Sequence, residues 1–501
     1  MTIAALLPLG VRKESRALSL AWLACLVAMI ASAVTGNRQL RALGIPAYFF
    51  GTAALGALSI GHEYSHRTLA LLLSQPARRE RLLLVKLGVL AGMLLTLCAA
   101  AYNSPVIRRV SPQGVASGYL LATVWLPVLC GLFLAPWLTM ICRSPIAGTV
   151  FTVTIPGILA VVGELIGVAT YGITPEADHF RFAIIWRGTL GLCAIGAVMS
   201  WRMFMRLEAI DSSPDVRLPQ WLRWTTTSAG ARPFTKRQPL WLLVKKELRL
   251  QQLAIVVAGL YILGWLTVVS LGLLVSEKET DAFNALMFLY GLLISLLIGS
   301  LASAEERQLG TLEWQMILPV ATWKQWAVKS GVALSLAMLL AFALPALLVS
   351  INPTNMGIHR DSDFLRLYIA VPILLFTAGS LYVSSLCSSG LKALLMSLPA
   401  ALGVVLFVNV IVEPLGSAVF TRVSQLSREI ARPRVAVSQF DPGFMSLLLA
   451  AVLLAMLLRF AMTNHRSAER AASRVWEQGI WMGGCVMVGM TVIAGVAAFS
   501  R

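Results

Sequence analysis

The sequence predicts an all-α, polytopic membrane protein, and its composition and its apolar runs both support that fold class. Of 501 residues, 58% are hydrophobic and 13% are charged, against about 45–50% and 25% in average globular proteins. Mean hydropathy is +0.78. Apolar runs long enough to cross a bilayer as helices recur from Ala17 to the C-terminus. These observations exclude a soluble enzyme, a disulfide scaffold and a disordered regulator.

The apolar runs define two groups of predicted spans. The first group lies near 17–34, 46–61, 86–101, 118–140, 147–168 and 182–204. A polar interval, 206–240, carries Pro, Ser, Thr and scattered charge, which is typical of a linker. The second group lies near 252–275, 283–303, 329–350, 367–387, 391–413, 443–461 and 479–499.

The placement of basic residues predicts the orientation. The net charge is +18, but the basic residues lie in short loops between spans, so we expect no nucleic-acid partner. Most of the 41 Lys and Arg residues fall on one side of the membrane if the N-terminus is cytoplasmic, as the positive-inside rule requires. We therefore expect a multi-pass protein of the cell inner (cytoplasmic) membrane, with its N-terminus in the cytosol and membrane lipids around it.

Two segments match at a fixed offset of 243 residues. The matched residues are Glu63, Thr68, Leu69, Pro76 and Lys86 in the first segment, and Glu306, Thr311, Leu312, Pro319 and Lys329 in the second. Upstream, Lys13, Glu14 and Arg16 match Lys246, Glu247 and Arg249 at an offset of 233 residues, so the second copy has ten extra residues in between. A repeat of this length indicates two homologous bundles. An even number of spans separates the copies, so both bundles face the same way, in parallel repeat.

This repeat predicts the domain organisation. We expect a first transmembrane half at 1–205, a cytoplasmic linker at 206–240 and a second half at 241–470. An extra C-terminal transmembrane helix, 471–501, completes a fold of two six-helix bundles and 12–13 spans.

Each matched segment lies between the second and third spans of its half. Glu and Thr near its start favour a helix N-terminus, leucines supply an apolar face, and Pro76 or Pro319 ends the helix. Thr68-Leu69 and Thr311-Leu312 would form a contact face, while Lys86 and Lys329 would anchor the segment at lipid headgroups. Two copies in register favour a docking element for a cytosolic partner.

These residues resemble the signature of ABC-2 type permeases, the membrane subunits of ATP-binding-cassette exporters. The resemblance covers both halves. It implies a coupling helix at 63–76 and another at 306–319, each fitting a groove on an ATPase. It also implies elbow helices around Lys13-Glu14 and Lys246-Glu247. The predicted span 479–499 and Arg67, which stands opposite Gly310, depart from the pattern.

The resemblance implies a transport subunit rather than an enzyme. The sequence contains no GxxxxGK[ST] phosphate-binding loop, so a separate cytosolic ATPase, in two copies, would bind ATP and Mg. No cofactor is expected in this chain. The direction would be export, with Glu164 and Glu413 as candidates for an external gate. The substrate is not named by the sequence, and an apolar or amphipathic molecule is the default.

Two alternatives belong to other classes. His62-Glu63-Tyr64-Ser65-His66 is an HExxH motif, which on a helix could bind zinc through His62 and His66 and activate water with Glu63. The repeat accounts for Glu63 without a metal, so we expect that this chain binds none. An ion-coupled carrier would need ionisable groups near mid-membrane, where the sequence offers none.

Overall fold

The structure is a computed structural model that describes twelve stretches of the chain. These are residues 9–34, 44–65, 68–74, 78–103, 117–171, 175–207, 239–270, 277–310, 320–351, 363–407, 442–466 and 472–499. All regular elements within these stretches are helical. Seven described helices are long and apolar enough to cross a membrane, or eight if one bent pair counts as a span. The chain is therefore an all-α, multi-pass membrane protein.

The first group of helices follows the predicted order. Its members are α1 (Leu9–Val34), α3 (Gly44–Ser65), α4 (Leu69–Leu73), α5 (Arg79–Asn103), α7 (Ser117–Leu129), α8 (Ala135–Cys142), α9 (Pro145–Tyr171) and α10 (Pro175–Met205). A π-helical turn, η2 (Cys130–Leu134), joins α7 to α8. The turn from α8 into α9 is tight, with Arg143 in the left-handed region at φ 50°.

The second group begins at the end of the predicted linker, with the first two residues of its opening helix inside it. Its members are α11 (Pro239–Leu250), α12 (Gln252–Ser270), α13 (Glu277–Leu309), α15 (Thr322–Ala337), α16 (Leu344–Ile351), α17 (Asp363–Leu386), α18 (Gly390–Phe407), α20 (Pro442–Arg466) and α21 (Ala472–Phe499). The π-helical segment η4 (Met338–Ala343) joins α15 to α16. The predicted span 479–499 lies within α21.

One central helix in each group has close neighbours. In the first group α3 packs against α1, α8 and α9, and in the second α13 packs against α17 and α18. Glycines permit this packing: a Cβ at Gly56 would lie 1.9 Å from the Gly131 carbonyl oxygen, and one at Gly299 would lie 2.5 Å from that of Thr377. Gly56 and Gly299 share the offset of the predicted repeat.

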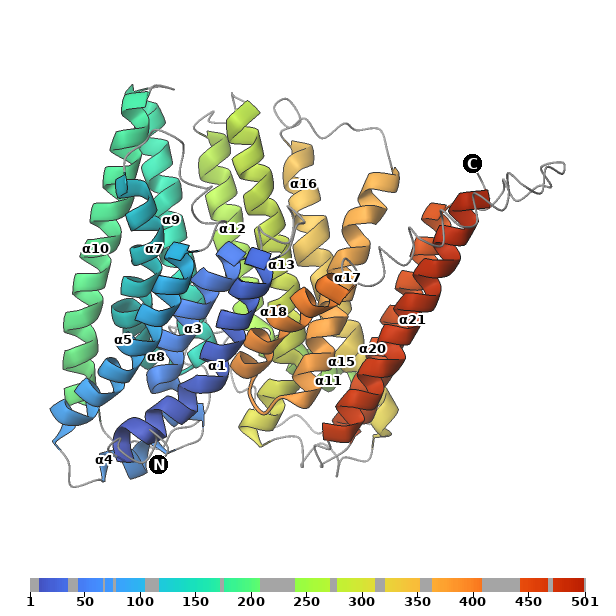
Figure 1. The fold of residues 1–501 in the computed structure, drawn as a ribbon, viewed down its shortest axis with the longest axis horizontal. Helices are drawn as coiled ribbons and strands as arrows, with labels where there is room; N and C mark the ends of the chain where they lie inside the picture. The colour runs from blue at the N-terminus through green and yellow to red at the C-terminus, as the bar shows by residue number, and fades with distance from the viewer. Residues whose placement is uncertain are drawn as a thin grey trace.

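The two groups of helices lie side by side (Figure 1), and α1 packs against α18 while α12 packs against α9. Gln308 Nε2 donates a hydrogen bond of 3.2 Å to Ser65 Oγ, and these two residues are themselves 243 positions apart. Figure 1 shows α4 and the start of α1 at one end of the bundle, which we call the α4 end.

Candidate functional site: two buried charge clusters at the α4 end

Three helices of the first group bring four charged residues together at the α4 end. Lys86, on α5, places its Nζ 2.7 Å from Glu14 Oε1 of α1 and 3.2 Å from Glu63 Oε1 of α3. Lys13 Nζ lies 3.0 Å from the same Glu63 oxygen. We call Lys13, Glu14, Glu63 and Lys86 the first tetrad.

The first tetrad is almost entirely removed from solvent. The side chain of Glu63 is 0% exposed and that of Lys86 is 2% exposed, whereas that of Lys13 is 49% exposed. Buried charges are tolerated only when they are paired and hydrogen-bonded. Lys86 meets this requirement, since it also donates to the Ser59 carbonyl at 3.3 Å. The half-exposed Lys13 adds little.

The second group of helices builds a matching cluster from Lys246, Glu247, Glu306 and Lys329, which we call the second tetrad. Lys246 and Lys329 both donate to the Glu306 carboxylate. Lys329 Nζ lies 3.8 Å from Glu247 Oε1 and donates to the Ala302 carbonyl at 2.8 Å. The helices are α11, α13 and α15, so the second tetrad also joins three elements.

The two tetrads share their internal spacing. In each, the buried lysine lies 23 residues after its glutamate and 27 residues after the carbonyl to which it donates. In each, a Lys-Glu pair from the helix that opens the group completes the cluster. The sequence analysis placed these Lys-Glu pairs in elbow helices and the central glutamates in coupling helices. In the structure the two kinds of segment are in direct contact through the tetrads.

The two carboxyls of the second tetrad lie outside the predicted spans, since Glu247 precedes 252–275 and Glu306 follows 283–303. They differ in acidity. Burial opposes ionisation of Glu306, but the ammonium groups of Lys329 and Lys246 prevail and lower its pKa to about 2. Burial raises the pKa of Glu247 to about 7. The Lys329 ammonium lowers this pKa but offsets the effect of burial only in part. The ammonium groups thus stabilise one charged carboxylate, and the second carboxyl can take up a proton near neutrality.

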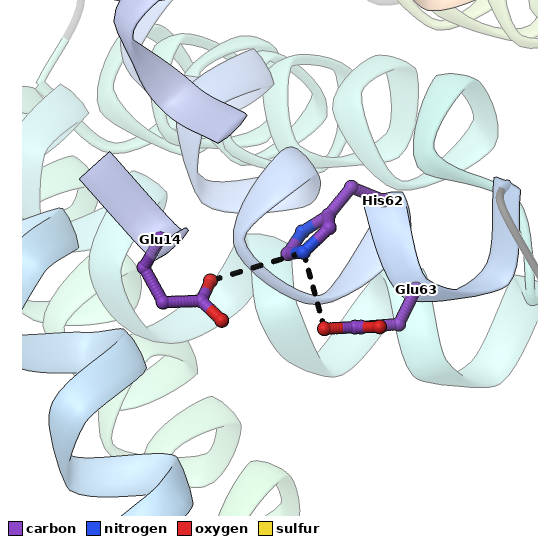
Figure 2. A group of neighbouring side chains, drawn as sticks. All are labelled: Glu14, His62 and Glu63. Atoms are coloured by element: carbon purple, nitrogen blue, oxygen red, sulfur yellow. Dashed lines mark ion pairs between the residues drawn. The ribbon is translucent and has the colours of Figure 1, made fainter. Parts of the chain in front are cut away.

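His62 belongs to the first tetrad alone. Its Nδ1 donates to the Leu58 carbonyl at 2.9 Å, and its Nε2 lies 3.1 Å from Glu63 Oε1 and 3.9 Å from Glu14 Oε2 (Figure 2). A carbonyl and a carboxylate both only accept hydrogen bonds. Nδ1 therefore carries a proton, whereas Nε2 lies close to the two carboxylates without forming a hydrogen bond in the described structure.

Within the described part of the chain, the same three side chains form the one group whose ligand atoms lie close enough together to hold a metal ion. The ligand atoms of Glu14, His62 and Glu63 all lie within 4.8 Å of one another. The Lys86 ammonium already bonds both carboxylates, so a divalent cation would have to lie directly against it. His66, the second histidine of the HExxH motif, is outside the described residues. The Lys86 ammonium is therefore the positive charge that both carboxylates contact.

The predicted coupling segment begins directly at the first tetrad. Thr68 Oγ1 donates to the Glu63 carboxylate, and the Thr68 amide donates to the Glu63 carbonyl at 3.0 Å. Leu69 and Leu72 of α4 are buried in a small apolar cluster that also holds Ile60, Leu83, Met140 and Phe204. Leu71 points the other way and is 68% exposed. The buried Leu69 therefore holds α4 to the bundle, and Leu71 forms the outward face.

Burial overturns one predicted role. Lys86 and Lys329 are both 2% exposed, so they are internal ion-pair partners and not anchors at lipid headgroups. The charge of a lysine could not distinguish these two roles in the sequence, because a lysine at a span boundary can contact either lipid headgroups or a buried carboxylate. Arg16 and Arg249, by contrast, are exposed on α1 and α11.

Several predicted site residues lie outside the described residues. These are Pro76, Thr311, Leu312, Pro319 and Glu413. Glu164 falls in α9, but its side chain is likewise outside the description. The predicted elbows differ from one another: α11 and α12 meet at a bend of 58°, whereas α1 runs as one helix from Leu9 to Val34.

Sequence reasoning missed two features of this site. The first is the contact of Glu14 with Lys86, which the matching Lys-Glu pairs upstream of each copy could have suggested. The second is Glu305, buried beside Glu306, whose counterpart at the repeat offset is His62. Comparison with protein-family models, curated proteins and solved structures gives no match.

Proposed function

We propose that this chain is the permease of an ABC-2 type exporter, made of two homologous halves and powered by a separate cytosolic ATPase. The single observation that carries this proposal is the pair of tetrads. Each tetrad joins the helix that opens its half to the two helices that contain the second and third predicted spans. A chance pair of ion clusters would not repeat the same spacing in two places. The α4 end is then the cytosolic end.

In this proposal the tetrads transmit movement. The first tetrad ties Glu63, and through it Thr68 and α4, to α1 and α5. A push on α4 would therefore be passed to three helices at once, because paired buried charges resist separation. ATP-driven closure of the ATPase would shift the halves between inward-open and outward-open states, which is a population shift driven by differential binding.

Leu71 is the outward-facing residue of α4 that suits an apolar socket on the ATPase. Thr68 and Leu69 support it from inside. In the second half, Thr311 and Leu312 would act in the same way. Charge reversal at Glu63 or Glu306 would test packing rather than docking, because both carboxylates are fully buried. Leu71 gives the sharper test.

The test is purification of the tagged chain from its own host in mild detergent, followed by identification of co-purifying proteins. We expect a soluble protein with a phosphate-binding GxxxxGK[ST] loop, at about two copies per chain as a two-site permease requires. The variant Leu71→Asp should reduce its recovery without altering elution of the chain on gel filtration. The matched control is Glu477→Lys, an exposed charge change on α21, which should leave recovery unchanged.

Two results would contradict the proposal in different ways. Absence of any such ATPase from the wild-type preparation would overturn the permease function itself. Normal ATPase recovery with Leu71→Asp would overturn only the docking role of α4. Stoichiometric zinc that disappears on changing His62 would favour the protease alternative instead.

A further inference from the structure

Glu305 is a buried carboxyl that the transmission function does not use. It lies on α13, is 8% exposed, and its Oε2 accepts no hydrogen bond within the described part of the chain. Burial raises its pKa to about 7. Burial of a carboxyl without a hydrogen-bond partner lowers the stability of the folded protein. A function for Glu305 would explain why this group is present.

The other buried carboxyls at the α4 end each have an ammonium partner. Glu14 pairs with Lys86 and Glu63 with Lys13 and Lys86. Glu247 and Glu306 both pair with Lys246 and Lys329. Glu305 differs from these four, because within the described residues no cation lies at ion-pair distance from it.

The charged groups on the surrounding elements do not neutralise Glu305. Arg307 donates to the Asn464 carbonyl at 3.1 Å, and Glu306 is held by the second tetrad. Arg143 precedes α9 and Lys392 lies on α18, and neither forms an ion pair with Glu305 in the described structure. Among the described residues the carboxyl is therefore left without a countercharge, and the side chains of Ile146 and Leu301 lie on the same side of Gly390.

Glu305 faces the junction of the two groups of helices. A Cβ placed at Gly390 of α18 would lie 3.0 Å from Glu305 Oε2 and 2.6 Å from Ile146 Cδ1 of α9. One turn along α13, Gln308 donates to Ser65 of α3, and its own Oε1 has no hydrogen-bond partner among the described residues. We call this junction of α3, α9, α13 and α18 the seam. The seam thus holds two unsatisfied acceptors on one face of α13.

We propose that Glu305 is a binding site for a cationic group, and that the substrate class of this permease is an organic amine with an apolar body. The proposal rests on the proposed transport function. In the closed seam, burial disfavours the charged form of the carboxyl. When α3 and α13 separate, Glu305 and Gln308 become accessible from the α4 end. An ammonium group would then satisfy both acceptors, while Ile146 and Leu301 contact the apolar part.

The chemistry favours a cation over a neutral molecule. An ammonium donates charge-assisted hydrogen bonds to a carboxylate, and these are about twice as strong as neutral ones. A neutral ligand would leave the carboxylate uncompensated. A free inorganic cation would satisfy the charge but not the apolar walls, so the apolar body adds affinity.

The experiment measures binding of dansylcadaverine, a fluorescent primary amine, to the purified full-length chain in detergent at pH 8. The matched probe is N-acetyl dansylcadaverine, which has the same skeleton without the charge. We expect the amine to bind about 10-fold or more tightly than the acetylated probe. Glu305→Gln should remove this preference and Glu305→Asp should retain most of it. The exposed acid Glu477, changed to Gln, should have no effect.

The outcomes separate this inference from the proposed function. Equal binding of both probes to the wild-type chain, or undiminished amine preference in Glu305→Gln, would overturn the cation site. Both measurements use the chain without an ATPase, so they are independent of the co-purification test. The thermal unfolding midpoint of Glu305→Gln distinguishes loss of binding from loss of folding. A midpoint at or above that of the wild type, together with lost binding, would support the cation site. A lower midpoint together with lost binding would instead favour a carboxyl with a purely structural role.

Discussion

The first and second tetrads share their ammonium–carboxylate pairs but differ in the group beside the central glutamate. Next to Glu63, His62 places its Nε2 3.1 Å from Glu63 Oε1 and 3.9 Å from Glu14 Oε2. Next to Glu306, Glu305 adds a carboxyl that turns away from its tetrad toward the seam. The shared pairs hold helices together in both halves, and the differing residue gives each half a separate electrostatic character.

The tetrads also differ in tightness. Lys86 lies 2.7 Å from Glu14, whereas Lys329 lies 3.8 Å from Glu247. The helix that carries Glu14 is continuous, while a 58° bend separates the helix of Glu247 from the next. Glu247 therefore has a looser contact with its buried lysine than Glu14 has, and α11 is held to α13 by the contact of Lys246 with Glu306.

The largest expected effect comes from removing the buried lysines. Lys86→Met leaves Glu14 and Glu63 buried with only the half-exposed Lys13 and His62 nearby, so we expect a loss of about 3–5 kcal/mol in the free energy of unfolding. Lys329→Met should cost less, because Glu247, with its pKa of about 7, can take a proton in place of the lost pair. Unfolding in mixed micelles, followed by tryptophan fluorescence, measures both.

The control for this prediction is Lys245→Met, an exposed lysine one position before Lys246. It should change the free energy of unfolding by less than about 0.5 kcal/mol. Equal losses for Lys86→Met and Lys245→Met would show that the first tetrad does not hold its helices together. A larger loss for Lys329→Met than for Lys86→Met would reverse the comparison of the two tetrads.

The next effect concerns pH and distinguishes Glu305 from the tetrads. Its pKa rises from 4.5 to about 7 in the folded chain, so the folded state binds more protons than the unfolded state between these values. Its contribution to stability is therefore fully present below pH 4.5 and is lost as the pH rises through about 7. The loss amounts to at most about 3 kcal/mol.

Glu305→Gln removes this titration. Its free energy of unfolding should match that of the wild type near pH 4.5 and exceed it near pH 8, when both are measured over that range. A difference between the two chains that stays constant with pH would mean that Glu305 has an unrecognised partner. Glu477→Gln provides the exposed control and should follow the wild type at every pH.

Much of the fold was readable from the sequence because membrane helices are specified locally. An apolar run must satisfy its own backbone inside a bilayer, and only a helix does so. The predicted interval 46–61 therefore lies within α3, and 479–499 within α21. The meeting of α1 with α18, in contrast, depends on side-chain shape along two distant surfaces, which hydropathy does not encode.

The site was readable only in part. The repeat identified Glu63, Glu306, Lys86 and Lys329, because identical spacing in two copies is a signal within one sequence. Their roles were not readable, since a lysine at a span boundary can turn toward lipid headgroups or inward to a carboxylate. The role of Glu305 was not readable, because it depends on the lack of a cation at ion-pair distance among the described residues, which only packing determines.

The smallest effect tests whether the two halves meet at equivalent positions. Ser65 and Gln308 form one hydrogen bond across the seam, and removal of either partner should cost about 0.5–1.5 kcal/mol. In a double-mutant cycle, Ser65→Ala and Gln308→Ala should cost together less than their sum, since each variant removes the same bond. Additive losses would place the two side chains apart in solution. They would also weaken the proposal that the seam opens between α3 and α13. The hydrogen bond between Ser65 and Gln308 is the contact that places matched positions of the two groups together at the seam.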